Sequence, residues 1–270
     1  MAKIHPLATV HPGAKLADSV EVGPYAFIDD NVEIGEGTRI LPHATIFSYV
    51  KIGKDCSVFP GAVVGAIPQD LKFEGEVTWV EIGDRVNIRE CATINRGTAA
   101  SGKYVTKIGN DVLIMSYVHV AHDCCVGNHC ILVSYVGIAG ETEVADWAII
   151  GGGTKVHQFT KIGTHAMIGG NSAVNKDVPP YSICGRSPFC FAGINLVGLR
   201  RRGFDSDVIR NIKDIYDLLY YQGYNFSDAC ARIEEGFPES EEKRTILDFV
   251  RNSKRGIVRG GDIHEKGGIE

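Results

Sequence analysis

The sequence has no run of about 18 or more consecutive apolar residues, and no charged-then-apolar leader precedes its first repeats. We therefore expect neither a membrane span nor a secretory signal, and we expect a cytoplasmic protein. Charge of one sign is not in large excess either, since the net charge is −5 over 270 residues. That length and balance fit an ordinary soluble protein with one elongated domain and one smaller domain.

The eight cysteines lack the regular spacing of a metal site or a disulfide framework. Cys56, Cys124 and Cys130 fall on a column of small side chains that we assign below to the protein interior. A cysteine in such a position acts as a compact hydrophobic residue. We therefore expect reduced thiols, as in cytosolic proteins.

Aliphatic residues recur at every sixth position along most of the first 187 residues. The column comprises Ile4, Val10, Leu16, Val22, Ile28, Ile34, Ile40, Ile46, Ile52, Val58, Val64, Ile82, Ile88, Ile94, Ile108, Ile114, Val120, Val126, Leu132, Ile138, Val144, Ile150, Val156, Ile162, Ile168 and Val174. Four positions after most of them stands a small residue, such as Ala44, Cys56 or Ala92. Neither an amphipathic helix nor an alternating strand has this period, which is typical of a parallel β-helix with three short strands per coil.

The repeat predicts an all-β solenoid over residues 1–187, interrupted by loops at about 66–80 and 95–107. Insertions in a solenoid leave the stack as loops, often on a binding face. Glycines that follow the aliphatic column, such as Gly23 and Gly35, are expected where corners turn tightly. Residues 188–270 are predicted to form a small all-α C-terminal domain that covers the last coil. Its expected helices span 206–221, 227–235 and 240–254, with Ser206, Ser227 and Ser240 as N-caps and a flexible tail from about 260.

Reactive side chains are densest between residues 115 and 130. Strands on one face of a β-helix stack about 4.8 Å apart, so residues one coil apart lie above one another. One face is therefore expected to display His119, His122, Asp123, Gly140, Glu141, His157 and Gln158. An imidazole suits general base catalysis at neutral pH, Asp123 is placed to orient it, and Gly140 would bare its N–H. Two alternatives remain open here, solvated surface histidines and a zinc ion held by several histidines across a subunit boundary.

Two further groups of residues bear on a substrate. The first loop offers Gln69, Asp70 and Lys72 to a polar ligand. Residues 200–202 bring three arginines together in an otherwise acidic chain. Guanidinium groups bind phosphates well, and such a patch also fits an acidic protein partner or a plain solvated surface.

Several longer strings resemble one family. They are IPQDLKF, EIGDRVNIRECATINRGT, HVAHDCCVGN, VHQF, DVPPY and GINLVGLRRRGF, and the similarity covers residues 1–259. The chain resembles the UDP-N-acetylglucosamine O-acyltransferases, which begin lipid A biosynthesis. The resemblance implies a left-handed β-helix, a homotrimer with active sites between adjacent prisms, and neither metal nor cofactor. It also implies transfer of a 3-hydroxyacyl chain from acyl carrier protein to the glucosamine 3-hydroxyl of UDP-N-acetylglucosamine.

The resemblance also implies roles for single residues. The candidate catalytic residues are His122 as general base, Asp123 beside it, and Gly140, whose N–H would hold the oxyanion. Substrate contacts are implied for Gln69, Asp70, Lys72, His119, His157, Gln158, Asn195, Arg201 and Arg202. Gly170 matches the acyl-length ruler, and the absence of a side chain there implies a long acyl chain. The chain departs from the family pattern at Glu141, Pro188 and Val197, so no role is carried over to these positions.

Other functions fit a β-helix of this kind. They include a hexapeptide acyltransferase with a 3-amino acceptor or a coenzyme A donor, a zinc carbonic anhydrase on the same prism, and a purely structural scaffold. An amide-forming relative is disfavoured because no uridine-binding domain precedes the repeats. The loops, the histidine face and the arginines together disfavour the scaffold.

Overall fold

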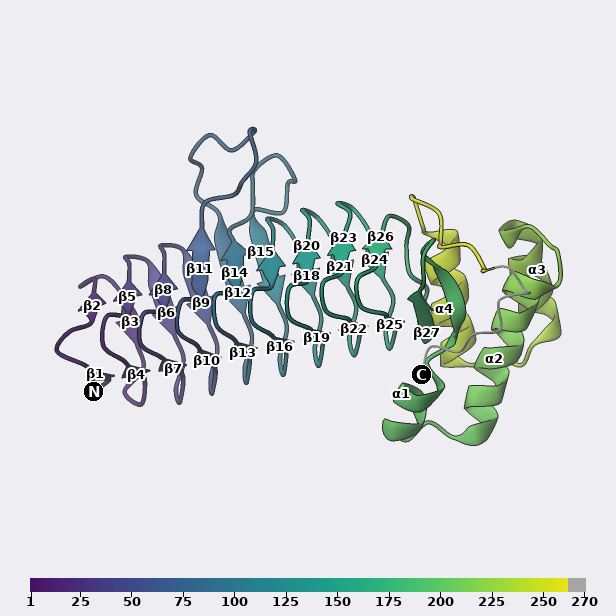
Figure 1. Ribbon diagram of the computed structural model, residues 1–270, viewed down its shortest axis with the longest axis horizontal. Helices are drawn as coiled ribbons and strands as arrows, with labels where there is room; N and C mark the ends of the chain where they lie inside the picture. Colours follow the sequence, from purple (N-terminus) through teal and green to yellow (C-terminus); the bar gives the residue numbers. More distant parts are fainter. Residues whose placement is uncertain (262–270) are drawn as a thin grey trace.

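A three-sided prism of stacked coils, followed by a cluster of helices, makes up the structure (Figure 1). The computed structural model describes residues 1–261. Each coil contributes one short strand to each of three parallel sheets, which we call sheets A, B and C. The predicted left-handed parallel β-helix is thereby confirmed. It departs from the right-handed connection that parallel strands usually adopt.

The strands are short because each side of the prism is only a few residues wide. Sheet A contains β1 Lys3–Ile4, β4 Glu21–Val22, β7 Arg39–Ile40, β10 Ser57–Val58, β13 Asn87–Ile88, β16 Leu113–Ile114, β19 Ile131–Leu132, β22 Ile149–Ile150, β25 Met167–Ile168, β27 Ser182–Gly185 and β28 Cys190–Ile194. Sheet B contains β2 Thr9–Val10, β5 Phe27–Ile28, β8 Thr45–Ile46, β11 Val63–Ala66, β14 Thr93–Asn95, β17 His119–Val120, β20 Gly137–Ile138, β23 Lys155–Val156 and β26 Ala173–Val174. Sheet C contains β3 Lys15–Leu16, β6 Val32–Ile34, β9 Val50–Ile52, β12 Trp79–Ile82, β15 Val105–Ile108, β18 Cys125–Val126, β21 Glu143–Val144 and β24 Lys161–Ile162.

The strand register locates both interruptions of the repeat. Stacked residues are normally 18 apart, as for Val120 and Ile138. Val64 pairs instead with Ile94, and Ile94 with Val120. The extra residues form the first loop, 67–78, and the second loop, 96–104, because the flanking strands extend further than the sequence suggested. Both loops leave the prism between sheet B and sheet C, an edge that we call edge BC (Figure 1).

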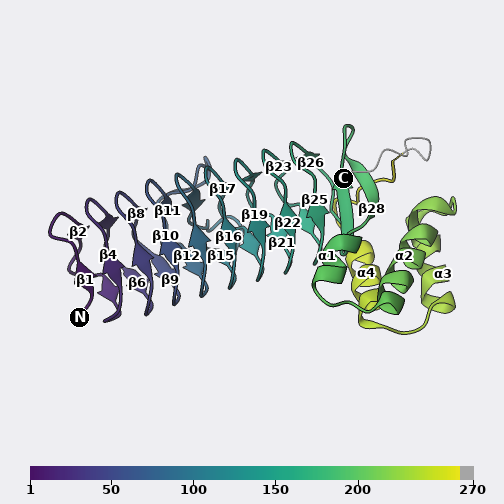
Figure 2. The same ribbon diagram turned by 60° about the horizontal axis from the view of Figure 1, so that its bottom comes forward.

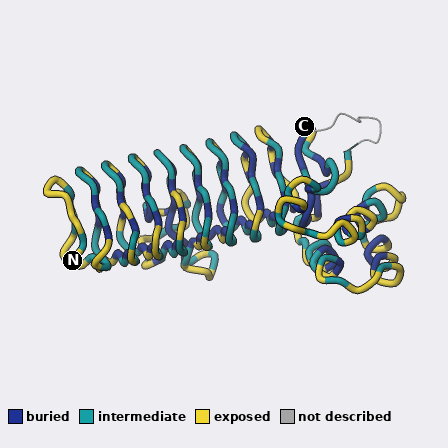
Figure 3. The backbone as a smooth tube through the Cα atoms, turned by 90° about the horizontal axis from the view of Figure 1, so that it is seen from below, coloured by how far each residue is buried: buried dark blue, intermediate teal, exposed yellow. Residues whose placement is uncertain are grey.

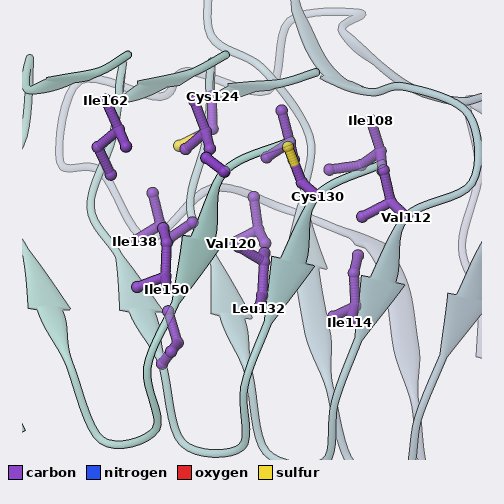
Figure 4. Packing of buried hydrophobic residues seen from close by; sticks show 14 of the residues in the cluster. Ile108, Val112, Ile114, Val120, Cys124, Cys130, Leu132, Ile138, Ile150 and Ile162 are labelled. Carbon is purple, nitrogen blue, oxygen red and sulfur yellow. The ribbon is translucent and has the colours of Figure 1, made fainter. Parts of the chain in front are cut away.

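The aliphatic and small columns fill the interior of the prism, as the spacing predicted (Figures 3 and 4). Val120, Ile138 and Cys130 are fully buried, and Cys124 is 1% exposed. Burial raises the pKa values of the Cys124 and Cys130 thiols to about 12, so both stay protonated at neutral pH. The free thiols include Cys56, Cys91, Cys124, Cys125, Cys130, Cys184 and Cys230.

The residues that turn the chain at the corners of the prism are mostly not the glycines expected from the sequence. The left-handed backbone positions are mostly held by other residues, such as Asn31, Asp55 and Asp123, all with φ between 53° and 60°. Short polar side chains tolerate that conformation better than most. Gly35 is needed for another reason, since a Cβ there would lie 2.7 Å from the backbone of the next coil. Glycine is therefore required at such a position because neighbouring coils approach closely, and not because the chain makes a tight turn there.

Sheet A continues past residue 187, where we placed the end of the β-helix. Strands β27 and β28 form an antiparallel hairpin at its end. Four helices follow, α1 Leu196–Arg201, α2 Ser206–Tyr221, α3 Phe226–Gly236 and α4 Glu241–Arg251 (Figures 1 and 2). The sequence missed α1, which has only six residues.

The helix caps follow the expectation at one of three sites. Ser240 caps α4 by accepting the N–H of Lys243, as predicted. Asn225, not Ser227, caps α3, and Ser206 is the first helical residue of α2. None of the helices within residues 1–261 has the length and apolarity of a membrane-crossing segment.

The helices close one end of the prism. The hydroxyl of Tyr216 in α2 donates to the carbonyl of Pro180 at 2.5 Å, and Asp177 forms a β-bridge with Ile257. Ile4, in the first coil, is by contrast 46% exposed. The tail expected from about residue 260 includes Gly260, which bridges Phe191. The rest of that tail, residues 262–270, lies outside the described part of the chain.

Candidate active site

Edge BC carries the histidine segment as well as both loops. His122 follows β17 and Gly140 follows β20 one coil away, with the N–H of Glu141 donating to the carbonyl of His122 at 3.0 Å. The 18-residue offset thus stacks the two residues as the repeat predicted. The first and second loops leave the same edge and approach this pair, so four separate segments meet there.

The imidazole of His122 lies between two carboxylates. Its Nδ1 is 2.8 Å from Oδ2 of Asp123, and its Nε2 is 3.8 Å from Oδ2 of Asp70 in the first loop. The hydrogen bond to Asp123 raises the pKa of His122, burial opposes the shift, and the charges of Asp123, Asp70 and Glu141 add to it. A carboxylate only accepts hydrogen bonds, so Nδ1 carries the proton. Nε2 of the neutral ring therefore holds the free lone pair, with the side chain 18% exposed.

Asp123 is not displayed on the face, contrary to the sequence-based expectation. Its side chain is 0% exposed because the second loop folds over it. Thr98 of that loop donates from its N–H to Oδ1 at 2.9 Å and from its hydroxyl to Oδ2 at 2.7 Å. Sequence reasoning missed Thr98 as a site residue, because its spacing is that of one more small residue in the interior column.

Gly140 has no side chain, so its backbone lies directly against the imidazole of His122. A Cβ built on Gly140 would lie 2.6 Å from both Cε1 and Nε2 of His122, so a side chain and the ring could not share this space. No hydrogen bond among residues 1–261 uses the N–H of Gly140. At the corner between sheets C and A (edge CA), by comparison, a side chain from the next coil caps the corresponding N–H of Lys54, Asp84, Asn110 and Asn128. Gly140 thus retains an unused donor beside the ring.

The other histidines of the face lie within two coils of His122. His119 on β17 contacts the hydroxyl of Thr93 through Nδ1 at 2.7 Å. Burial lowers the pKa of His119, and the charges of His122 and Lys155 lower it further, so this ring is neutral at neutral pH. His157 and Gln158 are exposed one coil beyond Gly140. Glu141 stands at the corner itself with φ of 58°.

The first loop brings its three polar residues to edge BC. Asp70 faces His122 and also accepts the N–H of Lys72 at 3.0 Å. Gln69 and Lys72 are exposed.

The residues after the β-helix gather at edge CA instead. Nδ2 of Asn195 donates to the carbonyl of His165, while its Oδ1 caps α1 by accepting the N–H of Gly198. Asn195 is 5% exposed, and these two hydrogen bonds hold the start of α1 against the prism. The exposed Val197, one of the departures, lies on the same helix.

Among the three arginines, Arg202 is partly buried and hydrogen-bonded, whereas Arg200 and Arg201 are exposed. Arg202 donates to the carbonyl of Trp147 at 2.9 Å, and its NH1 lies 3.2 Å from Nδ1 of His165. Burial and then the charge of Arg202 lower the pKa of His165 to about 4, so this ring stays neutral. Arg200 and Arg201 are exposed at the end of α1.

Gly170 lies on the third edge, between sheets A and B (edge AB). It follows β25 and stacks on Gly152, since its Cβ position lies 3.1 Å from the carbonyl oxygen of Gly152. One chain therefore distributes the candidate residues over three edges. It brings together His122, Asp123, Gly140 and Asp70, and it keeps Arg201 and Gly170 apart from them. Pro188, the remaining departure, follows a cis peptide bond in the β27–β28 connection.

Metal ligation has no obvious place in this arrangement. Among residues 1–261, no three His, Cys, Asp or Glu side chains converge as they would around a metal ion. Nδ1 of His122 and Nδ1 of His119 are each engaged by a neighbouring oxygen. The geometry supports proton transfer by His122 and hydrogen bonding by Gly140.

Comparison with known proteins shows the same combination of prism and helices. A family described as "Udp N-acetylglucosamine O-acyltransferase; Domain 2" matches residues 177–258, and one described as "Bacterial transferase hexapeptide (six repeats)" matches residues 106–140. The acyl-[acyl-carrier-protein]–UDP-N-acetylglucosamine O-acyltransferase of a Sulfurihydrogenibium species is 58% identical over 258 residues, which cover 96% of this chain and 95% of that protein. The enzyme of the same description from Chlorobaculum tepidum is 60% identical over 250 residues, covering 92% and 94%.

Solved structures agree. The UDP-N-acetylglucosamine acyltransferase of Bacteroides fragilis superposes with a TM-score of 0.93 at 49% identity, over 95% of this chain and 100% of that one. The corresponding structure from Francisella novicida gives a TM-score of 0.93 at 41% identity, over 96% and 95%. With identities of this size over nearly the whole length, the chain belongs to the UDP-N-acetylglucosamine O-acyltransferase family.

Proposed function

We propose that this protein transfers a 3-hydroxyacyl chain from acyl carrier protein to the glucosamine 3-hydroxyl of UDP-N-acetylglucosamine, the first step of lipid A biosynthesis. Membership of the family supports the reaction class. The observation that carries the proposal at the level of atoms is the pair formed by His122 and Gly140, with a free Nε2 and an unused backbone N–H side by side.

The reaction follows from that pair. Nε2 of His122 takes the proton of the sugar hydroxyl as its oxygen attacks the thioester carbonyl carbon. The carbonyl oxygen gains the negative charge and accepts a hydrogen bond from the N–H of Gly140. When the carbon–sulfur bond breaks, the thiolate recovers the proton from His122. Asp123 holds the ring and stabilises its charged form in between.

The surrounding charges fit a sugar nucleotide. Asp70 lies close enough to Nε2 of His122 for a hydroxyl group to bridge the two. Gln69, Lys72, His119, His157 and Gln158 border the same edge, and Lys72 adds a positive charge. Arg201 is exposed and suits a diphosphate, whereas Arg202 already has two partners within the chain.

We also propose that the protein acts as a homotrimer. The candidate residues lie on three different edges of one prism, so a single chain does not collect them around one substrate. A neighbour packed against edge BC would bring its own edges to His122. The outward column of sheet A is apolar in the later coils, with Leu113, Ile131, Ile149 and Met167 half-buried in one chain. Burial of this column by a neighbour would stabilise the assembly. The free thiols of Cys56, Cys124, Cys130 and the other cysteines given above fit action in the cytoplasm.

The acyl-length ruler gives the first prediction. Gly152 and Gly170 stack on edge AB, and neither has a side chain. The Gly170→Met substitution is expected to place a long side chain where an acyl chain would pass, so that turnover of long 3-hydroxyacyl thioesters falls at least tenfold relative to short ones. Turnover measured with a series of acyl carrier protein thioesters gives the preferred length. A variant that keeps the preference of the unsubstituted enzyme would remove the ruler role from Gly170.

The function itself is tested with purified protein. We expect acyl transfer from 3-hydroxyacyl-acyl carrier protein to UDP-N-acetylglucosamine, detected as a mass increase of the sugar nucleotide. The corresponding 3-amino sugar nucleotide and the coenzyme A thioesters serve as competing acceptor and donors. Faster product formation with either would identify a different acyltransferase. The mass of the assembly in solution tests the trimer.

A further inference from the structure

The second loop holds the carboxylate behind the catalytic histidine. It leaves edge BC between β14 and β15 and rises from the prism beside the first loop (Figure 1). Asp123 is fully buried beneath it. Nothing in the reaction described above requires a residue of this loop, yet two of its hydrogen bonds reach one functional group, the carboxylate of Asp123.

Thr98 contacts both oxygens of that carboxylate. Its backbone N–H donates to Oδ1 at 2.9 Å, and its hydroxyl donates to Oδ2 at 2.7 Å. Oδ2 is also the oxygen that accepts Nδ1 of His122 at 2.8 Å. Thr98 therefore fixes the carboxylate plane at both oxygens, including the one that faces His122.

Thr98 is itself held in place. The N–H of Ser101 donates to its hydroxyl oxygen at 3.3 Å, and the hydroxyl of Ser101 donates to its carbonyl at 3.1 Å. The next residue, Ala99, donates its N–H to Oε1 of Glu76 in the first loop at 2.8 Å. Thr98 is 1% exposed, so water does not compete for these contacts. The two loops thus brace each other at the point where Thr98 meets Asp123.

We propose that Thr98 is a positioning residue for the acyl transfer, acting through Asp123 to keep Nδ1 of His122 hydrogen-bonded and Nε2 directed at the acceptor hydroxyl. The inference rests on the proposed function and adds a residue that touches neither substrate.

The pKa shifts of Asp123 and His122 agree with a positioning role for Thr98. Burial raises the pKa of Asp123, but hydrogen bonds from His122, from the N–H and hydroxyl of Thr98 and from Ser101 outweigh it, so that pKa lies below its usual value. Without the Thr98 hydroxyl, Oδ2 loses one of its two donors, so the pKa of Asp123 rises and the carboxylate is held less firmly. The pKa of His122 is raised first by its hydrogen bond to Asp123, and this loss lets it fall.

Other groups face the ring as well. The carboxylates of Asp70 and Glu141 raise the pKa of His122 from the first loop and from the neighbouring corner. His119 faces it from β17 and is itself held neutral by burial. Lys103 lies 3.5 Å from the carbonyl of Asp123 and also faces Glu143. None of these groups is altered by a substitution at Thr98, so a change in the pH profile reports on Asp123 and His122.

The test compares Thr98→Val with Thr98→Ser and with the matched control Thr154→Val. Thr154 is also fully buried, but its hydroxyl donates to the carbonyl of Gly169, away from His122. For Thr98→Val we expect kcat to fall about tenfold, with KM for UDP-N-acetylglucosamine within twofold. The acid limb of its pH–kcat profile should move to lower pH. Thr98→Ser should restore both, and Thr154→Val should leave both unchanged. An unchanged kcat, an unmoved limb or a limb moved to higher pH would overturn the proposal.

A double-mutant cycle tests whether Thr98 acts through Asp123 or independently of it. In an Asp123→Asn background, Thr98→Val should lower kcat by less than twofold, because its effect passes through the missing carboxylate. A second tenfold loss would show that Thr98 acts independently, which contradicts the inference. Failure of the inference and failure of the proposed function give different results. If the proposed function is wrong, His122→Ala retains activity or no acyl transfer occurs. If only the inference is wrong, His122 is still essential and Thr98→Val stays active.

Discussion

Replacement of His122 by alanine is expected to lower kcat for acyl transfer by about 10²- to 10⁴-fold, the range typical of a lost general base. Among residues 1–261, the substitution removes the only imidazole that combines a free Nε2 with the bare backbone of Gly140. Binding of UDP-N-acetylglucosamine should change less, because Asp70 and the basic residues remain. Steady-state rates with purified 3-hydroxyacyl-acyl carrier protein give the measurement.

The matched control is His43→Asn. His43 is an exposed imidazole at another corner, with φ of 62°, a conformation that asparagine tolerates. It should leave kcat unchanged. In the unsubstituted enzyme the base works only when deprotonated, and the pKa of His122 is raised by the hydrogen bond to Asp123. The rate should therefore rise with pH through a value above the usual pKa of an imidazole. A His122→Ala rate within threefold of the unsubstituted enzyme would give the role to another group.

The Gly140→Ala substitution is expected to lower kcat by about 10²- to 10³-fold, the usual effect of losing an oxyanion donor. Its methyl group would stand 2.6 Å from Cε1 and Nε2 of His122, so the ring must move and the N–H of Gly140 is screened. The base and the oxyanion donor would be disturbed together. Rates with the native thioester and thermal unfolding are measured side by side.

A control with the same chemical change is Gly236→Ala. A Cβ at this position in α3 meets nothing within 4 Å, so neither rate nor stability should fall. The unfolding midpoint of Gly140→Ala should stay within a few degrees of that control, since the clash involves one partly buried ring outside the aliphatic interior of the prism. Full activity of Gly140→Ala would mean that the carbonyl oxygen is held elsewhere.

The stacking of His122 on Gly140 was predictable because a solenoid translates sequence offset into spatial position. Each coil adds the same number of residues, so residues 18 apart meet wherever the repeat is unbroken. The burial of Asp123 was not predictable. It depends on how the second loop folds, and an aperiodic loop has no register from which Thr98 could be placed. The corners were misjudged for a related reason, since the period locates a corner but not which of its residues adopts positive φ.

The sequence by itself determined the parallel β-helix, the location of its interruptions and the pairing of His122 with Gly140, because all three follow from a fixed period and the burial of aliphatic side chains. Only the tertiary structure decided where the loops and the residues beyond the repeat lie. It placed Arg201 away from His122, and it used Asn195 to cap a helix that the sequence did not reveal. Those outcomes depend on loop conformation and on the packing of α1 against the prism, where contacts between distant segments outweigh local pattern.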